Sequence, residues 1–242
     1  MSNTEFSNEF DILFNNIMSN QAPGLDEYEK SIFLTEAQED LVLSIYSGSF
    51  NGSFESSEEF RQYLAPLVKT SEATKIIKSY DVNFTKDSKL YTINNDVWFI
   101  TSEYIVTSKK ENDNCASEIE IPVVPITQDE FFKIKNNPFR NSSRRRVLRL
   151  DIGADSINSI INPTTTSNRI VELITSYEVS KYIIRYIRKP KPIILQGAIS
   201  GTLQIDGVST ETQCELSSAL HRRILERAVL LAKASFVSNP GQ

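Results

Sequence analysis

Residues 90–107, LYTINNDVWFITSEYIVT, decide the fold class of this 242-residue chain. Asn94-Asn95-Asp96 is a tight-turn signal, so we predict a strand over 90–93 and a second strand over 97–107. In the second strand, Trp98 and Ile100 share one face, while Val97 and Phe99 share the other. Before this stretch apolar residues recur with a period near 3.6, and from about residue 80 the period is 2.

Helices are therefore expected before residue 80. Ser2 and Glu5 fit a capping box and predict a helix over 3–18. Because this helix lies at a terminus, we expect its apolar stripe to pack on a neighbouring subunit. The stripe consists of Phe6, Phe10, Leu13, Phe14 and Ile17.

Further helix signals follow along the N-terminal region. Residues 26–34 predict a short helix, and Thr35-x-x-Gln38 predicts the cap of another that ends at Gly48. Ser56-x-x-Glu59 predicts a third capped helix, which Pro66 kinks or ends.

Strand patterns dominate the chain from residue 90 to residue 213. Alternation predicts strands over 119–123, 146–152, 170–175, 182–188, 193–195 and 201–205. Thr127 and Glu130 predict a short capped helix between them, and residues 215–236 predict a final helix with Ser217 as its N-cap. We therefore expect an α+β fold: a helical N-terminal region over 1–68, an antiparallel β-rich body over 69–213, and a C-terminal helix over 214–242 that packs on the body.

Charge is distributed unevenly along the chain. Residues 1–60 have a net charge of −11 and residues 61–242 a net charge of +6, which together give −5. An acidic head and a basic body favour head-to-tail contact between copies, although two solvated faces would give the same pattern. The expected interface residues of the basic clusters are Arg140, Arg144, Arg145, Arg146, Lys181, Arg185, Arg188, Lys189 and Lys191.

The composition excludes several classes of site. One histidine and two cysteines cannot build a Cys/His zinc cluster or a disulfide framework. The sequence contains no GxGxxG, GxxxxGK[ST] or GxSxG motif. It also contains no apolar stretch long enough to span a membrane, and its first twenty residues show no secretory signal. We expect no catalytic residues, no cofactor and no metal.

Isolated chemical groups have simpler structural explanations. Asp129, Glu130 and Lys133 resemble a nuclease constellation, but acidic residues in the first turn of a helix favour its dipole. Asp151 and Asp155 could hold a divalent ion, although an ion pair between Asp151 and Arg149 is simpler. His221 is expected on the surface, and Cys115 is expected to be an incidental thiol.

Several phrases along the whole chain match a known group of proteins. This sequence resembles the virion structural proteins of crAss-like tailed phages that infect gut Bacteroidales, and most closely the ring proteins stacked below the portal. None of these short sequence segments is a catalytic signature, so the specificity of the resemblance comes from their number and their order. The matching segments are FDILFNNI at 10–17, APGLDEYEKS at 22–31, FLT at 33–35, PIT at 125–127, NPFR at 137–140, RRVLRLD at 145–151, RYIRKPKPIIL at 185–195, and the stretch that begins with CEL over 214–228.

The resemblance implies a non-enzymatic subunit of a closed, commonly twelve-fold ring at the head–tail junction. Its partners would be further copies of itself, the portal, and neighbouring connector and tail proteins, and packaged DNA would pass through the lumen. Assembly would take place in the cytoplasm of the bacterial host. Two alternatives remain open: a DNA-binding virion or packaging accessory that uses the same arginines on phosphates, and a metal-dependent nuclease.

Overall fold

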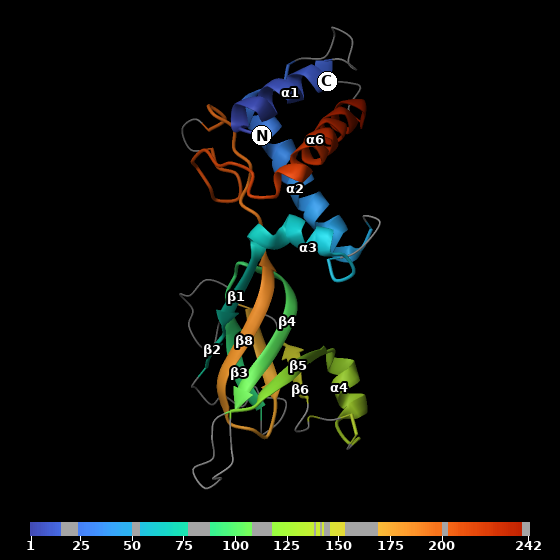
Figure 1. The fold of residues 1–242 in the computed structure, drawn as a ribbon, viewed down its shortest axis with the longest axis vertical. Coiled ribbons are helices and arrows are strands. Elements are labelled where there is room, and N and C mark those ends of the chain that lie inside the picture. The colour runs from blue at the N-terminus through green and yellow to red at the C-terminus, as the bar shows by residue number, and fades with distance from the viewer. Residues whose placement is uncertain are drawn as a thin grey trace. The chain divides into compact units, whose positions relative to one another are not determined.

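A computed structural model describes the chain at residues 1–15, 24–49, 54–76, 88–107, 118–137, 139–140, 142, 146–152, 169–199 and 203–238. The chain separates into two compact units. Residues 1–67 and 189–242 form one unit, here called the helical unit, and residues 68–188 form the other, the sheet unit. The expected α+β class is confirmed, with helices at the start, strands in the middle and a helix at the end (Figure 1).

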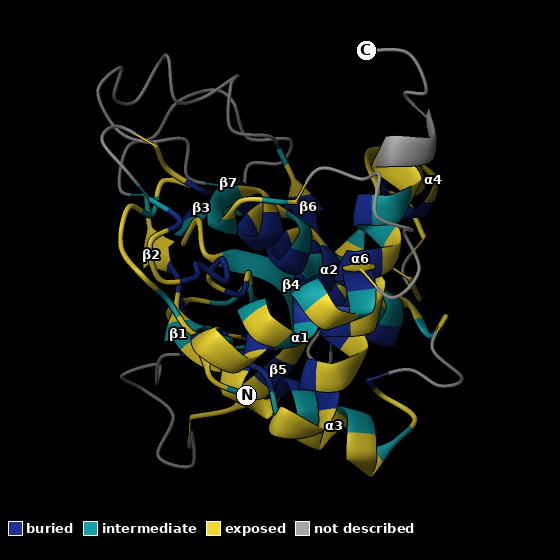
Figure 2. Ribbon diagram, turned by 90° about the horizontal axis from the view of Figure 1, so that it is seen from above, coloured by how far each residue is buried: buried dark blue, intermediate teal, exposed yellow. Residues whose placement is uncertain are grey.

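Three helices build the helical unit: α1 (Asn3–Asn15), α2 (Glu27–Ser47) and α6 (Ser218–Ser238). α6 packs against both α2 and α1, whereas the sequence had placed this helix on the β-rich body. The apolar stripe of α1 points into this packing, since Phe6 and Phe10 are fully buried and Phe14 is almost so. Buried and exposed residues recur at helical spacing along α6 (Figure 2), as expected for a helix with one packed face.

α2 is a single helix where the sequence analysis predicted two. Asp26 caps it, accepting from the Glu29 amide at 2.7 Å while the Glu29 carboxylate accepts from the Asp26 amide at 3.1 Å. Thr35, predicted to be an N-cap, lies inside the helix, and its hydroxyl donates to the Ser31 carbonyl. Gly48 ends the helix with φ 81°, a left-handed conformation in which a β-carbon would be strained.

A buried polar stripe on α2 holds an extended segment of the same unit. The Ser31 and Thr35 hydroxyls accept from the amides of Leu195 and Ile193, at 3.0 and 3.1 Å. The Gln38 side-chain amide donates to the Lys191 carbonyl at 2.8 Å. Side chains of α2 thus supply partners that a neighbouring strand would otherwise provide.

This arrangement corrects the strand predicted at 193–195 and the described part, 203–205, of the strand predicted at 201–205; residues 201 and 202 lie outside the described residues. Outside the named strands, Ile194 forms one isolated bridge with Thr212, and Ile205 forms another with Val208. The three consecutive apolar residues of 193–195 are buried, but they pack beside α2 instead of joining the sheet.

α3 (Glu58–Leu64) completes the helical unit and runs into a 3-10 turn over Ala65–Leu67. The end of α3 just before Pro66 agrees with the prediction for that residue. The N-cap is Ser57 and not the predicted Ser56, and the Ser57 side chain makes no capping hydrogen bond.

The strands of the sheet unit form one eight-stranded sheet, in the order β1-β8-β4-β5-β6-β7-β3-β2. Neighbouring strands are antiparallel except for β5 and β6, which are parallel, so the sheet is mixed where an antiparallel one was predicted. The strands are β1 (Val68–Glu72), β2 (Thr74–Lys75), β3 (Ser88–Ile93), β4 (Val97–Thr107), β5 (Glu120–Ile126), β6 (Val147–Asp151), β7 (Arg169–Ile174) and β8 (Val179–Arg188).

The two edges of this sheet belong to one stretch of chain. β1 pairs with β8, β2 pairs with β3, and only Ala73 separates them. The Ala73 amide still donates to the Tyr182 carbonyl of β8 at 2.9 Å, while the next residue, Thr74, pairs with Thr92 of β3. The sheet therefore curls round and closes on itself through β1 and β2.

β5 makes a second such transition. Its first residues pair with β4, and those from Val123 to Ile126 pair with β6. The turn between β3 and β4 connects the two halves of the sheet in the same way, because β3 pairs with β2 and β7 while β4 pairs with β5 and β8. The two strands on either side of the predicted tight turn therefore do not form a hairpin.

A single apolar core fills the closed sheet. It takes residues from both halves, including Tyr91 of β3, Ile105 of β4 and Tyr182 of β8. The rings of Tyr91 and Tyr182 meet edge to face at a centroid distance of 5.3 Å. The outer face of β6 is covered by α4 (Gln128–Ile134), so β6 is buried on both sides.

Candidate functional site

The described acidic residues that the sequence analysis singled out lie in a helix turn and in ion pairs. Among the residues that the structure describes, no three His, Cys, Asp or Glu side chains lie close enough to hold a metal ion. Asp129 and Glu130 lie in the first turn of α4, which Thr127 caps as predicted. Asp151 pairs with Arg149 and with Arg169, at 3.7 and 2.8 Å, which confirms the ion-pair interpretation. Asp155 and Cys115 lie outside the described residues.

His221 is buried, in contrast to the surface position expected for it. Its side chain packs on the Phe6 ring at a centroid distance of 5.4 Å. Nε2 lies 3.1 Å from the Leu216 carbonyl, and the Met1 amino group lies 2.7 Å from Nδ1. Burial lowers the pKa of the imidazole. A neutral ring that links α1 to α6 has a structural role.

A second buried polar cluster lies inside the sheet unit. Arg149 of β6 contacts Glu103 of β4 at 3.1 Å, and the Tyr182 hydroxyl donates to the same carboxylate. Burial raises the pKa of the Glu103 carboxyl, against the opposing effect of Arg149. It also raises the pKa of the Tyr182 hydroxyl. The cluster lies within the core and joins β4, β6 and β8.

The predicted interface residues of α1 are placed differently from expectation. Phe6, Phe10 and Phe14 are core residues of their own helical unit, and Leu13 is half-buried. Ile17 lies outside the described residues. The exposed apolar residue of α1 is Ile12, whose side chain is 59% exposed. An apolar stripe on a terminal helix fits an own-chain core as well as it fits a subunit contact.

The second basic cluster is divided between the two units, and the first is only partly described. In the first, Arg140 is exposed and Arg146 donates to its carbonyl, while Arg144 and Arg145 lie outside the described residues. In the second, Lys181 and Arg185 are exposed on β8 and Arg188 is half-buried.

The remaining two lysines of the second cluster belong to the helical unit. Lys189 pairs with Glu39 and Asp206, at 3.0 and 2.7 Å. Lys191 pairs with Glu215 at 3.6 Å. Acidic neighbours therefore neutralise this end of the cluster.

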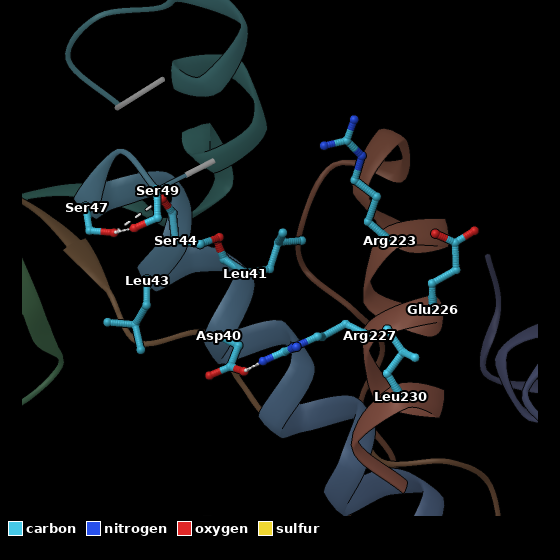
Figure 3. Close-up of a pocket in the computed structure, with 10 residues that line it drawn as sticks. All are labelled: Asp40, Leu41, Leu43, Ser44, Ser47, Ser49, Arg223, Glu226, Arg227 and Leu230. Carbon is cyan, nitrogen blue, oxygen red and sulfur yellow. Dashed lines mark hydrogen bonds and ion pairs between the residues drawn. The ribbon is translucent and has the colours of Figure 1, made fainter. Parts of the chain in front are cut away.

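A groove between α2 and α6 has a cavity volume of about 690 Å³. Leu41 of α2 points toward α6, and Arg227 of α6 reaches to Asp40 of α2 at 2.9 Å (Figure 3). Leu230 lines the groove and remains 58% exposed. The full lining is Asp40, Leu41, Leu43, Ser44, Ser47, Ser49, Arg223, Glu226, Arg227 and Leu230.

An aromatic projection stands on the sheet unit. α4 packs Phe131 and Ile134 on β6, and this leaves the adjacent Phe132 61% exposed. In the turn after α4, the Asn137 side chain accepts from the Phe139 amide at 3.0 Å, and Phe139 is 94% exposed. We call the exposed residues Phe132, Lys133, Lys135, Phe139 and Arg140 the α4 knob.

Sequence reasoning missed both the groove and the knob. One signal was available for the knob: Phe131 and Phe132 are consecutive in a short helix, so only one of them can face the core. The groove had no local signal, because its two walls are some 180 positions apart in the chain.

The two units carry opposite net charges. The helical unit has sixteen acidic and eight basic residues, which gives −8. The sheet unit has fifteen acidic and eighteen basic residues, which gives +3. The predicted division between an acidic and a basic part therefore follows the structural units, although the acidic part also includes the C-terminal region.

Comparison with known proteins identifies the family. A family model described as phage tail ring protein 3/4 matches residues 1–242. Ring protein 3 of Bacteroides phage crAss001 is 46% identical over 236 residues, which are 96% of this chain and 95% of that protein. Ring protein 4/5 of the same phage is 34% identical over 244 residues, which are 98% of this chain and 94% of that protein.

These matches confirm the resemblance found in the sequence, along the whole chain. No helix in the described part of the chain is long and apolar enough to cross a bilayer. The buried histidine contacts the Leu216 carbonyl, and the buried Glu103–Arg149 pair joins two strands. The chain belongs to the phage tail ring protein 3/4 family.

Proposed function

We propose that this protein is a non-enzymatic structural subunit of a closed ring in the phage virion, at the junction of head and tail. The observation that supports this most directly is the match to the ring-protein family along the entire chain. The ring would continue the portal channel, and DNA would pass through its lumen. We propose twelve copies per ring, the number implied by the resemblance.

The charges of the chain support a ring built from repeated contacts. Two units of opposite sign in one subunit allow the acidic unit of one copy to meet the basic unit of the next. A contact between two different surfaces repeats around an axis and closes when the rotation fits, which is how heterologous interfaces make rings. A net charge of −5 also suits a channel through which DNA moves without tight binding.

The test is to measure the mass of the full chain in solution, together with a protein inventory of purified virions. Native mass spectrometry across protein and salt concentration should show one discrete, high oligomer, and the virions should contain the protein. If the virions lack this chain, the proposed role is wrong. If the mass series gives a discrete ring of another order, twelve-fold symmetry is wrong and the ring function stands.

DNA binding is the second candidate function, favoured by Lys181 and Arg185. Both are exposed on β8, and among the described residues neither has an acidic partner in an ion pair. Binding of a DNA duplex by the purified chain, weakening steeply with salt and reduced in a Lys181→Ala/Arg185→Ala variant, would support this candidate. Lys189→Ala/Lys191→Ala is the matched control, because acidic residues already neutralise those two lysines.

A further inference from the structure

The helical unit and the sheet unit each leave one unusual surface uncovered, and the two surfaces are complementary. We infer that the α4 knob of one subunit docks into the α2–α6 groove of the neighbouring subunit. This inference rests on the proposed ring function and specifies which surfaces make the ring contact.

The α4 knob has the properties of a protein–protein interface. Phe139 at 94% and Phe132 at 61% are the two most exposed aromatic side chains among the large apolar residues described. The capped helix and the hydrogen-bonded turn hold both rings outward, so little conformational entropy is lost when they are covered. Exposed aromatic side chains of this kind are enriched at the centres of protein interfaces.

The groove offers the matching apolar surface. Leu41 and Leu230 face it from opposite walls, and its volume of about 690 Å³ is in the range of cavities that hold a bulky apolar group. Arg223 and Arg227 lie in its lining. A guanidinium can stack on the face of an aromatic ring, so these arginines suit Phe132 or Phe139 as an occupant.

Charge favours a second copy of this chain as the partner. Lys133, Lys135 and Arg140 give the knob a charge of +3, although Asp129 and Glu130 in the first turn of α4 are also exposed. α2, one wall of the groove, has a net charge of −4, whereas α6, the other wall, has four basic residues and one acidic residue, and the groove lining contains two charges of each sign. The charge preference therefore comes from the units as a whole, because the knob belongs to a unit with a net charge of +3 and the groove to a unit with a net charge of −8.

The geometry of the contact follows from the difference between the two surfaces. Because knob and groove belong to different surfaces of the same chain, the contact is heterologous and each copy uses one of each. Every subunit would then bind two neighbours, and the chain of contacts ends only when a ring closes.

Cross-linking of cysteine variants tests this docking in the full-length protein. We would join thiols with a short bismaleimide in a Phe139→Cys/Leu230→Cys double variant and in the two single variants. Both positions are exposed, so these substitutions should leave the fold intact. The single variants also measure any background from the native cysteines.

Docking in trans has a distinctive outcome. The double variant should give a ladder of covalent oligomers, and a mixture of the two single variants should give covalent dimers only, because each subunit then has one reactive surface. A double variant that cross-links only within one chain, or that gives no product above the single-variant background, would overturn the docking. This measurement captures transient contacts, so it also applies to protein that is mainly monomeric.

Charged substitutions give a second, independent test in sedimentation experiments. Leu230→Asp and Phe139→Asp should each weaken self-association by roughly 30-fold or more, as expected for central interface residues. Leu203→Asp and Ile119→Asp are matched controls, since both residues are exposed and lie outside the groove and the knob. If both test variants form rings as readily as the wild type does, the docking is wrong and the ring function stands. Absence of the protein from virions would instead remove the function.

Discussion

The two units of this protein bury polar groups in different ways. In the helical unit, neutral groups of Ser31, Thr35 and Gln38 satisfy the backbone of an extended segment. In the sheet unit, a buried carboxylate and guanidinium, Glu103 and Arg149, satisfy each other inside a closed sheet. The side chains of α2 take the place of a paired strand. The Glu103–Arg149 pair joins β4 and β6, which are not neighbours in the sheet. Loss of one partner should therefore cost more in the sheet unit, where it leaves an uncompensated buried charge.

The largest expected effect is that of Arg149→Met. Removal of the guanidinium leaves Glu103 charged and buried, which should reduce the free energy of unfolding by about 3–5 kcal/mol. Trp98 is the only tryptophan and lies in β4, so its fluorescence in a urea titration reports on the sheet unit. Glu103→Gln/Arg149→Met is the control: it removes both charges and keeps an acceptor for Tyr182, so it should recover most of the loss. If Arg149→Met has the same free energy of unfolding as the wild type, the Glu103–Arg149 pair does not stabilise the sheet unit.

Thr35→Val should have an intermediate effect, confined to the helical unit. The substitution keeps the shape of the side chain but leaves the Ile193 amide buried without its acceptor, which should cost about 1–3 kcal/mol. Circular dichroism at the helix band should show earlier unfolding while Trp98 fluorescence stays unchanged. Thr35→Ser keeps the hydroxyl and should retain most of the stability. Equal losses in both variants would show that the methyl group, not the hydrogen bond, stabilises this contact.

The helix caps provide a smaller effect with an internal control. Asp26→Ala removes a side-chain cap and should destabilise α2 by about 1 kcal/mol, whereas Ser57→Ala removes no hydrogen bond and should stay within about 0.5 kcal/mol of wild type. Thermal unfolding followed at the helix band would compare the two variants. Similar losses in both would contradict the assignment of Asp26 as the working cap.

Protonation of His221 has the smallest expected effect on the free energy of unfolding at neutral pH, because the imidazole is neutral there in both the folded and the unfolded chain. Burial lowers its folded pKa, so the unfolded chain takes up a proton first as the pH falls below about 6.5. The helical unit should therefore lose stability between pH 7 and pH 5. The difference in unfolding free energy between wild type and His221→Gln, measured at each pH, isolates this contribution from that of the carboxylates. A difference that stays constant over this range would contradict the lowered pKa.

Local patterns in the sequence were sufficient for much of the fold. The change from helix to strand comes earlier than the predicted residue 80, since β1 begins at Val68. The strand over 97–107, the Thr127 cap and the helix end at Gly48 were all predicted and are confirmed. Each depends on hydrogen bonds or side-chain spacing within a few residues, so a single sequence contains the information. The two basic clusters were also found as sequence features, but the sequence could not show which of their members have acidic partners.

Tertiary structure decided the features whose partners are distant in the chain. Thr35 lies 158 positions from Ile193 in the chain, so no local pattern could show their hydrogen bond. The sequence around Thr35 is also compatible with a helix N-cap, and only the packing of the extended segment on α2 decides between the two roles. The closure of the sheet at Ala73, the parallel pairing of β5 with β6, and the burial of His221 against Phe6 also depend on packing between remote segments. Periodicity tells which face of an element is apolar, but it does not tell what covers that face. For the same reason the aromatic stripe of α1 became core, while Phe132 and Phe139 remained at the surface.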